Sequence, residues 1–227
     1  MQNIITIILK RILPKKIRTL LRQLQKKIVY FFRRQIIRFP VFHNKPIKVI
    51  LGAAMTYQKG WYSTNQEWLD IVVYDDWKSI FKNKRLLTNI LAEHVFEHLT
   101  PDQMKTSLNF VVRHMKAGGI IRIAVPDGYN PDPEYIKHVD ISGIGADAAD
   151  HKQLLNWDTL KKYLIDAGLK PELKEGYLKS GKLIQQTIDA GLGNVVRSRT
   201  NDNIYNRTGW SFNDANTSLI VDGTLEK

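Results

Sequence analysis

The strongest chemical signal in this chain of 227 residues is a short segment of acidic residues and histidines. Residues 93–98 read EHVFEH and directly follow the apolar run of residues 90–92. A carboxylate beside a histidine favours its protonated form and can orient it, so such a pair can transfer protons. The letters also match H-x-x-E-H, a motif in which two histidines on one helix bind zinc. Because His94 ends a predicted strand, we expect a proton-transfer role for it and no metal site, with Glu97 and His98 as supporting or structural residues.

A second set of titratable residues brackets a long loop over about 128–151 that is rich in Gly, Pro and Asp. Asp127 ends the apolar run of residues 120–125, and Asp150 and His151 close the loop. If the loop folds back, a histidine and a carboxylate could act as a base and its orienting group. We therefore predict His94, Asp127, Asp150 and His151 as catalytic residues. The structural alternatives are a turn cap for Asp127 and a solvated histidine for His151.

Short apolar runs alternate with amphipathic stretches from Pro46 onward, and this pattern predicts an α/β domain over residues 46–227. The pattern predicts helices over 77–81, 102–115 and 157–167. The dipeptide Thr100-Pro101 begins the second helix and Gly118 and Gly119 close it, while Gly168 ends the third. Strands are predicted over 47–51, 61–65, 71–74, 87–92, 120–125, 173–178 and 218–221. In open α/β sheets ligands bind at the carboxyl ends of the strands, where Asp127 is expected.

Several segments, taken in order, resemble the class I S-adenosylmethionine-dependent methyltransferases. The specific part is an EHxxEHL segment (residues 93–99) followed by GGxxRIxVPD (residues 118–127), and the resemblance spans about 47–222. It implies a Rossmann-like, seven-stranded, mostly parallel sheet with flanking helices and an antiparallel last strand. S-adenosylmethionine would bind across the carboxyl ends of the strands. The other matching segments are LGAA at 51–54, GW at 60–61, DHK at 150–152, RS at 197–198 and SLIVD at 218–222.

The resemblance also implies a set of cofactor-binding residues. Asp75 and Asp76 follow the strand predicted at 71–74, where the family holds the adenine or its ribose, although a helix N-cap is an equal alternative. Glu93 and His94 would lie beside the methionine part. The remaining predicted contacts are Gly52, Ala53 and Ala54 in the first turn and Asn65 after the second strand.

The sequence departs from the family pattern at two of these positions. Ala54 stands where the family has glycine, and alanine lacks the freedom of glycine to adopt a positive φ. Asn65 stands where the family has an acidic residue that binds the ribose hydroxyls, so a charge-assisted hydrogen bond becomes a neutral one. Weakened cofactor binding, or a relative that binds no cofactor, is therefore an alternative.

The charge of the chain is concentrated at its N-terminus. The first 66 residues hold 14 Lys and Arg and no acidic residue, whereas the rest holds 20 basic and 22 acidic residues. Residues 2–38 show helical spacing of Ile, Leu and Phe, interrupted by Pro14 and by basic residues. This spacing predicts a basic amphipathic helical arm over residues 1–45.

The arm has three possible partners. An anionic membrane surface would accept both its apolar and its basic side chains, and we favour this partner for residues 2–38. Packing on the domain or on another protein is the structural alternative. Nucleic acid is less favoured, because it would leave the apolar face in water. We expect no transmembrane helix and no signal peptide, and a cytoplasmic protein that is peripheral on the inner face of a membrane.

Composition excludes other classes of protein. The chain has no cysteine, which removes disulfides, thiolate zinc sites, iron–sulfur clusters and cysteine nucleophiles. The expected function is methyl transfer from S-adenosylmethionine to a hydroxyl of a small molecule or glycan, as in polysaccharide biosynthesis. The acceptor pocket is expected in the loop over 128–151 and the segment 180–216, where aromatic residues provide binding surfaces or belong to the core: Tyr129, Tyr135, Trp157, Tyr205 and Trp210. The alternatives are a cofactor-free membrane-associated scaffold and a methyltransferase that acts on nucleic acid. The sequence does not define an oligomeric state.

Overall fold

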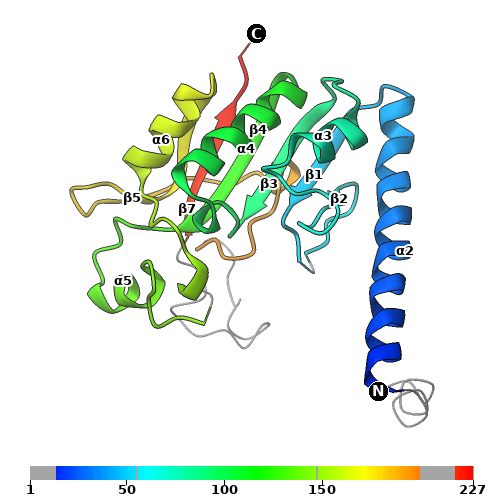
Figure 1. The fold of residues 1–227 in the computed structure, drawn as a ribbon. Coiled ribbons are helices and arrows are strands. Elements are labelled where there is room, and N and C mark those ends of the chain that lie inside the picture. The colour runs from blue at the N-terminus through cyan, green and yellow to red at the C-terminus, as the bar shows by residue number, and fades with distance from the viewer. Residues whose placement is uncertain (1–13, 55, 147, 200–217, 227) are drawn as a thin grey trace.

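A computed structural model describes residues 14–54, 56–146, 148–199 and 218–226. A seven-stranded sheet forms its centre, with the order β2-β1-β3-β4-β7-β5-β6 (Figure 1). The neighbours β2, β1, β3 and β4 pair in parallel, whereas β7 is antiparallel to both β4 and β5, and β6 is antiparallel to β5. The predicted Rossmann-like sheet, mostly parallel and with an antiparallel last strand, is confirmed. The strands are β1 (Ile47–Leu51), β2 (Tyr62–Ser63), β3 (Leu87–Glu93), β4 (Met115–Pro126), β5 (Lys170–Tyr177), β6 (Leu183–Gln185) and β7 (Ser218–Thr224).

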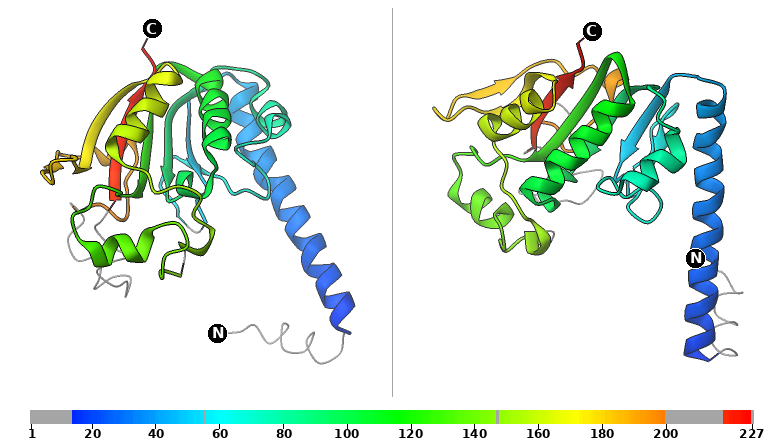
Figure 2. Two further views of the ribbon diagram at one scale, coloured as in Figure 1. Left: turned by 60° about the vertical axis from the view of Figure 1, so that its left-hand side comes forward. Right: turned by 45° about the horizontal axis from the view of Figure 1, so that its top comes forward.

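Helices α3 (Tyr74–Phe81), α4 (Pro101–His114) and α6 (Trp157–Asp166) lie on one face of the sheet (Figures 1 and 2). Their buried faces join alternate residues of the strands in the main hydrophobic core. Helix α4 begins with a capping box, in which Thr100 and Gln103 bond each other's backbone amides, and with Pro101 in its first turn. Asn156 caps α6 in the same way. Local sequence signals therefore fix where these two helices begin.

The other face of the sheet is covered mainly by an extended segment. In doubly wound sheets helices cover both faces. Here Ile188 and Val195 pack on the second face of the strands, against Ile50, Leu91 and Ile220 among others. We call residues 188–199 the covering segment; it includes the short helix η3 (Ala190–Leu192).

One buried ion pair ties the covering segment to the centre of the sheet. Arg122 on β4 is fully buried, and its Nε and Nη2 atoms each lie 2.7 Å from a carboxylate oxygen of Asp222 on β7. Its remaining nitrogen, Nη1, donates to the carbonyl oxygens of Asp189 (2.8 Å) and Gly193 (2.6 Å). The guanidinium thus joins two strands and the covering segment, and its charge is compensated inside the protein.

The basic arm is one long helix, α2 (Lys15–Phe42), which starts directly after Pro14. Its C-terminal half packs on the domain through the buried side chains of Ile37 and Val41. Arg34 forms an ion pair with Asp76 at 2.9 Å. The N-terminal half extends beyond the sheet, as the second view in Figure 2 shows most clearly. The residues predicted as helical before Pro14 lie outside the described part of the chain.

Three local predictions from the sequence are wrong. Residues 71–74 are not a strand but form a turn that leads into α3. The side chain of Trp77 in this helix is buried in the main core, and this packing favours the helix. The loop over 128–151 contains two helices, α5 (Pro133–Val139), which Asp132 caps, and the short η2 (Ala148–Asp150). Gly118 and Gly119 lie within β4 and do not end α4, which stops at His114. Strand β6 was not predicted.

Candidate functional site

The chain changes direction in the sheet between β1 and β3. Strand β1 lies between β2 and β3, so successive connections leave it toward opposite edges of the sheet. Ligands of open α/β sheets bind at such a switch point, beyond the carboxyl ends of the strands. Gly52 follows β1 with a φ of +57°, and a Cβ atom there would lie 2.6 Å from Cγ2 of Val95, which follows β3. The two strand ends are therefore packed together at a position that only glycine fits.

The turn after β1 is held by its own neighbours. Ala53 N donates to the carbonyl oxygen of Thr64 (2.7 Å), and Ala54 N donates to Oδ1 of Asn65 (2.8 Å). Ala54 adopts a φ of +47° although it is not glycine. Asn65 was predicted to bind the ribose of the cofactor. Instead, its side-chain oxygen accepts the backbone amide of Ala54 in the turn after β1. Residues 52–54 and Asn65 do lie together, as the resemblance implied.

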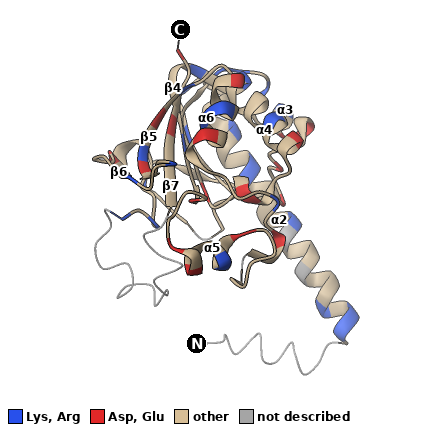
Figure 3. Ribbon diagram, turned by 90° about the vertical axis from the view of Figure 1, so that its left-hand side faces the viewer, with Lys and Arg blue, Asp and Glu red and all other residues tan. Residues whose placement is uncertain are grey.

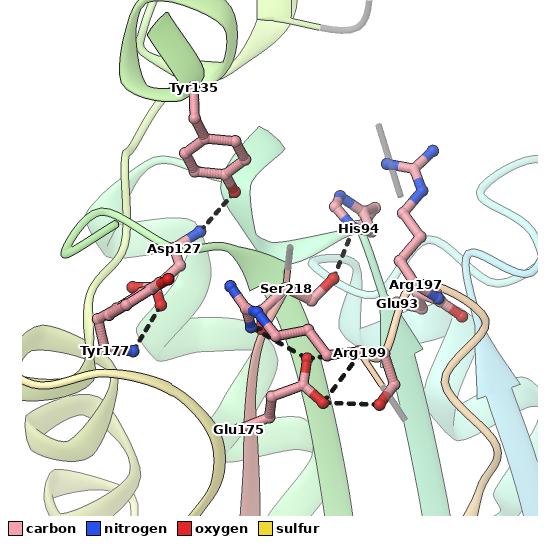
Figure 4. Close-up of polar contacts among 10 residues, drawn as sticks. Glu93, His94, Asp127, Tyr135, Glu175, Tyr177, Arg197, Arg199 and Ser218 are labelled. Atoms are coloured by element: carbon pink, nitrogen blue, oxygen red, sulfur yellow. Dashed lines mark hydrogen bonds and ion pairs between the residues drawn. The ribbon is translucent and has the colours of Figure 1, made fainter. Parts of the chain in front are cut away.

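His94 is the most distinctive residue at this edge. It follows β3 with a φ of +54°, an uncommon conformation that its surroundings must hold in place. Its Nδ1 lies 2.9 Å from Oε1 of Glu97, and its Nε2 lies 3.2 Å from the hydroxyl oxygen of Ser218 at the start of β7. The contact with Glu97 gives His94 the geometry of a histidine base that a carboxylate orients. Figure 4 shows the contact of His94 with Ser218.

Glu97 supplies that carboxylate from the short helix η1 (Phe96–His98) and is almost fully buried. Burial alone would raise the pKa of Glu97. The imidazole of His94, through its charge and a hydrogen bond, and the charge of His98 outweigh burial and hold this pKa below its ordinary value. Glu97 therefore stays ionised and can orient His94 across the neutral pH range.

Two further carboxylates bind the covering segment instead of facing an open crevice. Glu93 accepts hydrogen bonds from the backbone amides of Val196 (3.0 Å) and Arg197 (2.8 Å). Glu175 on β5 is fully buried and accepts from the hydroxyl of Ser198 (2.7 Å) and from the backbone and side chain of Arg199. Figure 4 shows the contacts of Glu175 with Arg199. The predicted cofactor ligand Glu93 is thus engaged by the protein itself.

Asp127 is fully buried and has a structural position. Its Oδ1 accepts from the amide of Tyr129 (3.0 Å) and its Oδ2 from the amide of Tyr177 (2.7 Å), while its own amide donates to the hydroxyl of Tyr135 (2.9 Å). Burial raises the pKa of Asp127, although these two amides and the charge of Arg199 act in the opposite direction. The turn-cap alternative describes this residue, because each of its two carboxylate oxygens accepts a backbone amide.

Asp150 and His151 return to the sheet edge, but they join His98 and not Asp127. Oδ1 of Asp150 lies 3.0 Å from Nδ1 of His98, and the rings of His98 and His151 are 5.0 Å apart. Nδ1 of His151 lies 2.8 Å from the carbonyl oxygen of Val139 at the end of α5. The loop does bring its closing residues back, at a distinct cluster next to Glu97.

The acidic pair Asp75 and Asp76 lies away from the switch point. Both residues occupy the first turn of α3. The carboxylate of Asp76 binds the side chain of Arg34 (2.9 Å) and the amide of Asp70 (2.9 Å). Because residues 71–74 are not a strand, these aspartates do not follow a strand end, and the helix-terminus alternative describes them.

The aromatic residues expected to line an acceptor pocket differ in their positions and contacts. Tyr135 is buried, Tyr129 donates to Asp158, and Trp157 packs against the main core. Tyr205 and Trp210 lie outside the described residues. A surface cavity of about 530 Å³ lies along the covering segment, lined by Gln185, Gln186, Thr187, Ile188, Ala190, Asn194, Val195 and Ser198.

Sequence reasoning missed the specific partners of His94. Glu97 was expected only as a supporting or structural residue, and Ser218 was only part of a matching segment. Glu97 is only three positions from His94, whereas the contact with Ser218 joins residues 124 positions apart, which no local periodicity encodes. Glu175 has a weak signal, as an acidic residue inside a predicted strand whose neighbours are partly apolar.

Comparisons with known proteins give distant structural likenesses. No protein-family model matches the chain, and no curated protein matches it by sequence. It is similar to a SAM-dependent methyltransferase from Archaeoglobus fulgidus, with 18% identity, 87% of this chain and 93% of the other covered, and a TM-score of 0.46. It is also similar to a SAM-dependent methyltransferase from Thermotoga maritima, a possible histamine N-methyltransferase, with 10% identity, 90% and 97% covered, and a TM-score of 0.45.

Proposed function

We propose that the chain is an S-adenosylmethionine-dependent methyltransferase. The observation that carries this proposal is the meeting of the Gly52 turn and the strained His94 at the switch point between β1 and β3. Ligands of open α/β sheets bind at this point, and the missing Cβ of Gly52 lets the turn after β1 pack against Val95 there. The matching sequence segments of the family fall at the same strand ends.

His94 would remove the proton of the methyl acceptor. S-adenosylmethionine supplies an electrophilic methyl group when it is bound. A hydroxyl acceptor must lose its proton as the new bond forms, so it requires a nearby base. Nε2 of His94 is the candidate, because Glu97 holds Nδ1 and only the hydroxyl of Ser218 lies against Nε2 among the described residues. This arrangement supports a hydroxyl of a small molecule or glycan as the acceptor.

The arm supports a location at a membrane surface. Eleven large apolar side chains of α2 are at least 41% exposed. Nine of them recur at three- and four-residue spacing and form one face of the helix, which we call the apolar face: Ile17, Leu20, Leu21, Leu24, Ile28, Phe31, Phe32, Phe39 and Phe42. Ile37 and Val41 face the domain, so the apolar face points elsewhere.

The charge of α2 complements an anionic surface. The helix has nine Lys and Arg residues and no acidic residue, and Figure 3 shows these positions along it. An anionic lipid headgroup layer matches this combination of basic and apolar side chains. None of the helices in the described part of the chain combines the length and the apolar character needed to cross a bilayer. We therefore propose peripheral binding to anionic lipid, as on the cytoplasmic face of a membrane.

A cofactor-free scaffold is the second candidate function. It is favoured by one observation: the protein already occupies groups that would bind the cofactor. Both carboxylate oxygens of Glu93 accept amides of the covering segment, and the amide oxygen of Asn65 accepts from Ala54. In this case the domain would hold α2 at the membrane without catalysing a reaction.

Calorimetric titration of the full chain with S-adenosylmethionine separates the two candidates. We expect binding by the wild type and weaker binding by Gly52→Ala, since an added Cβ would lie 2.6 Å from Cγ2 of Val95 and force the turn after β1 to move. Gly118→Ala is the matched control, because its φ is +76° and an added Cβ would meet nothing within 4 Å. His94→Gln should keep binding and lose methyl transfer. Absence of binding at millimolar cofactor would exclude the methyltransferase and leave the cofactor-free scaffold as the remaining candidate.

A further inference from the structure

We propose that Glu97, His98 and His151 bind a divalent transition-metal ion. One potential ligand atom from each of these side chains lies within 4.8 Å of the other two. Glu97 and His98 come from η1, and His151 follows η2, so two distant segments of the chain build the site. The H-x-x-E-H match in the sequence pairs His94 with His98, whereas the fold places His98 next to His151, with ring centroids 5.0 Å apart.

Backbone hydrogen bonds place His151 beside η1. The carbonyl oxygen of Glu97 accepts from the amides of Lys152 (2.8 Å) and Gln153 (3.2 Å). The loop is therefore attached to η1 directly after His151. This attachment does not depend on any of the three proposed ligand side chains, so the position of the site is set before a metal binds.

The outer contacts of His151 leave one nitrogen available. Its Nδ1 lies 2.8 Å from the carbonyl oxygen of Val139, which accepts only if Nδ1 carries the proton. Nε2 then has the free lone pair that a metal requires. Metal-binding histidines are commonly oriented by such a bond from their other nitrogen to a carbonyl or a carboxylate.

The carboxylate of Glu97 is the second observation that points to a cation. The side chain is 1% exposed, and its Oε2 has no hydrogen-bond partner in the described part of the chain. An ionised carboxylate without full compensation is costly inside a protein. Because His94 lies against Oε1, Oε2 is the oxygen that a metal ion could satisfy.

The ligand set determines the class of metal. Two imidazoles and one carboxylate suit Zn²⁺, Mn²⁺ or Fe²⁺ better than Ca²⁺ or Mg²⁺, which prefer oxygen ligands. Three protein ligands leave coordination positions for water or another oxygen ligand. Oδ1 of Asp150, 3.0 Å from Nδ1 of His98, is close enough to orient that ring.

Metal titration of the full chain tests the proposal without cofactor or acceptor, so its outcome is independent of the proposed methyl transfer. After treatment with chelator, the chain is titrated with Zn²⁺ or Mn²⁺ by calorimetry, and bound metal is measured after dialysis. We expect one equivalent in the wild type and none in His98→Ala or His151→Ala. Asp150→Asn should weaken binding by on the order of 10- to 100-fold. His43→Ala removes an exposed histidine at the end of α2 and should bind like the wild type.

A spectroscopic measurement on the unmodified protein covers the case in which the histidine variants fail to fold. Electron spin-echo measurements on the Mn²⁺-loaded chain should show coupling to two imidazole nitrogens. The absence of such coupling, no binding by the wild type, or unchanged binding in folded His98→Ala and His151→Ala would each overturn the proposal.

Discussion

Two residues at the strand ends, Ala54 and His94, adopt backbone conformations that side chains disfavour. For Ala54 the expected consequence is a strained turn, since the left-handed region costs a non-glycine residue about 1–2 kcal/mol. Ala54→Gly removes this strain and adds some entropy to the unfolded chain, so we expect a net gain of about 0.5–1 kcal/mol in unfolding free energy. Denaturant titration measures the gain. The control Ala53→Gly, at a buried position without positive φ, should instead lose about 1 kcal/mol.

His114 gives the protein a pH-dependent stability. Burial lowers the pKa of this fully buried histidine below its ordinary 6.5, and the nearby charge of Arg113 acts in the same direction, against the hydrogen bond to Phe110. The unfolded chain therefore binds more protons than the folded chain as the pH falls below about 6.5. Stability should decrease from pH 6.5 downward, and not above it.

The variant His114→Leu should flatten this part of the pH profile, as measured by urea denaturation at several pH values. His43→Leu, at an exposed position, should keep the wild-type slope. An equal slope in His114→Leu and the wild type would show that other groups control acid stability.

Among the elements, α2 carries the clearest interaction surface. Burying three or four side chains of its apolar face contributes several kcal/mol at about 25 cal/mol per Å², and each basic residue near an anionic surface adds about 1 kcal/mol. We expect the full chain to sediment with vesicles that contain anionic lipid. Replacing Leu20, Leu24 and Phe31 by serine should weaken this binding by roughly 100-fold or more. Because these side chains are exposed, the melting temperature should change little.

The matched control replaces polar residues of the same helix, Gln23 and Gln25, by serine. High salt should weaken vesicle binding only in part, because screening leaves the apolar contribution intact. Substitution is preferable to removing the arm, since Ile37 and Val41 belong to the main core. If the full chain does not bind anionic vesicles but binds RNA with a steep salt dependence, the membrane proposal is wrong and nucleic acid is the partner of the arm.

At the scale of the whole molecule, the covering segment is attached to the sheet by side chains. Arg122, Glu93 and Glu175 bind it at successive points, and Gln58 exchanges two hydrogen bonds with the backbone of Asn194. Removing one attachment should open the segment locally without unfolding the sheet.

We expect Glu93→Ala to accelerate hydrogen exchange at the amides of Val196 and Arg197 by at least tenfold, because both amides lose their acceptor. Exchange at β3 and β4 should stay unchanged. Mass spectrometry of peptides from the two regions measures the difference, and the exposed Glu172→Ala serves as a control. Unchanged exchange at both amides would mean that the segment is held mainly by its packing on Ile50 and Leu91.

The sequence by itself determined the class of fold, because its signals are local. Strand β1 was predicted with its observed bounds, and the Thr100-Pro101 and Gly168 signals placed α4 and α6 within a residue or two. Alternating burial, caps and turn residues act over a few positions and need no knowledge of the fold. The prediction was wrong where the local signal was weak and tertiary packing decided the structure. At residues 71–74 a strand was predicted, but the burial of Trp77 favours a helix.

Only the tertiary structure decided the partners of the chemical residues. His94, Glu93 and Asp127 were found from the sequence because they directly follow apolar runs, but each also had a structural alternative. Long-range contacts decided between the two: Asp127 and Glu93 accept the backbone amides of Tyr177 and Arg197, whereas His94 meets Ser218. The pairing of His98 with His151 likewise depends on backbone bonds between residues 97 and 152–153. Such contacts are set by how the whole chain packs, so no spacing in the sequence encodes them.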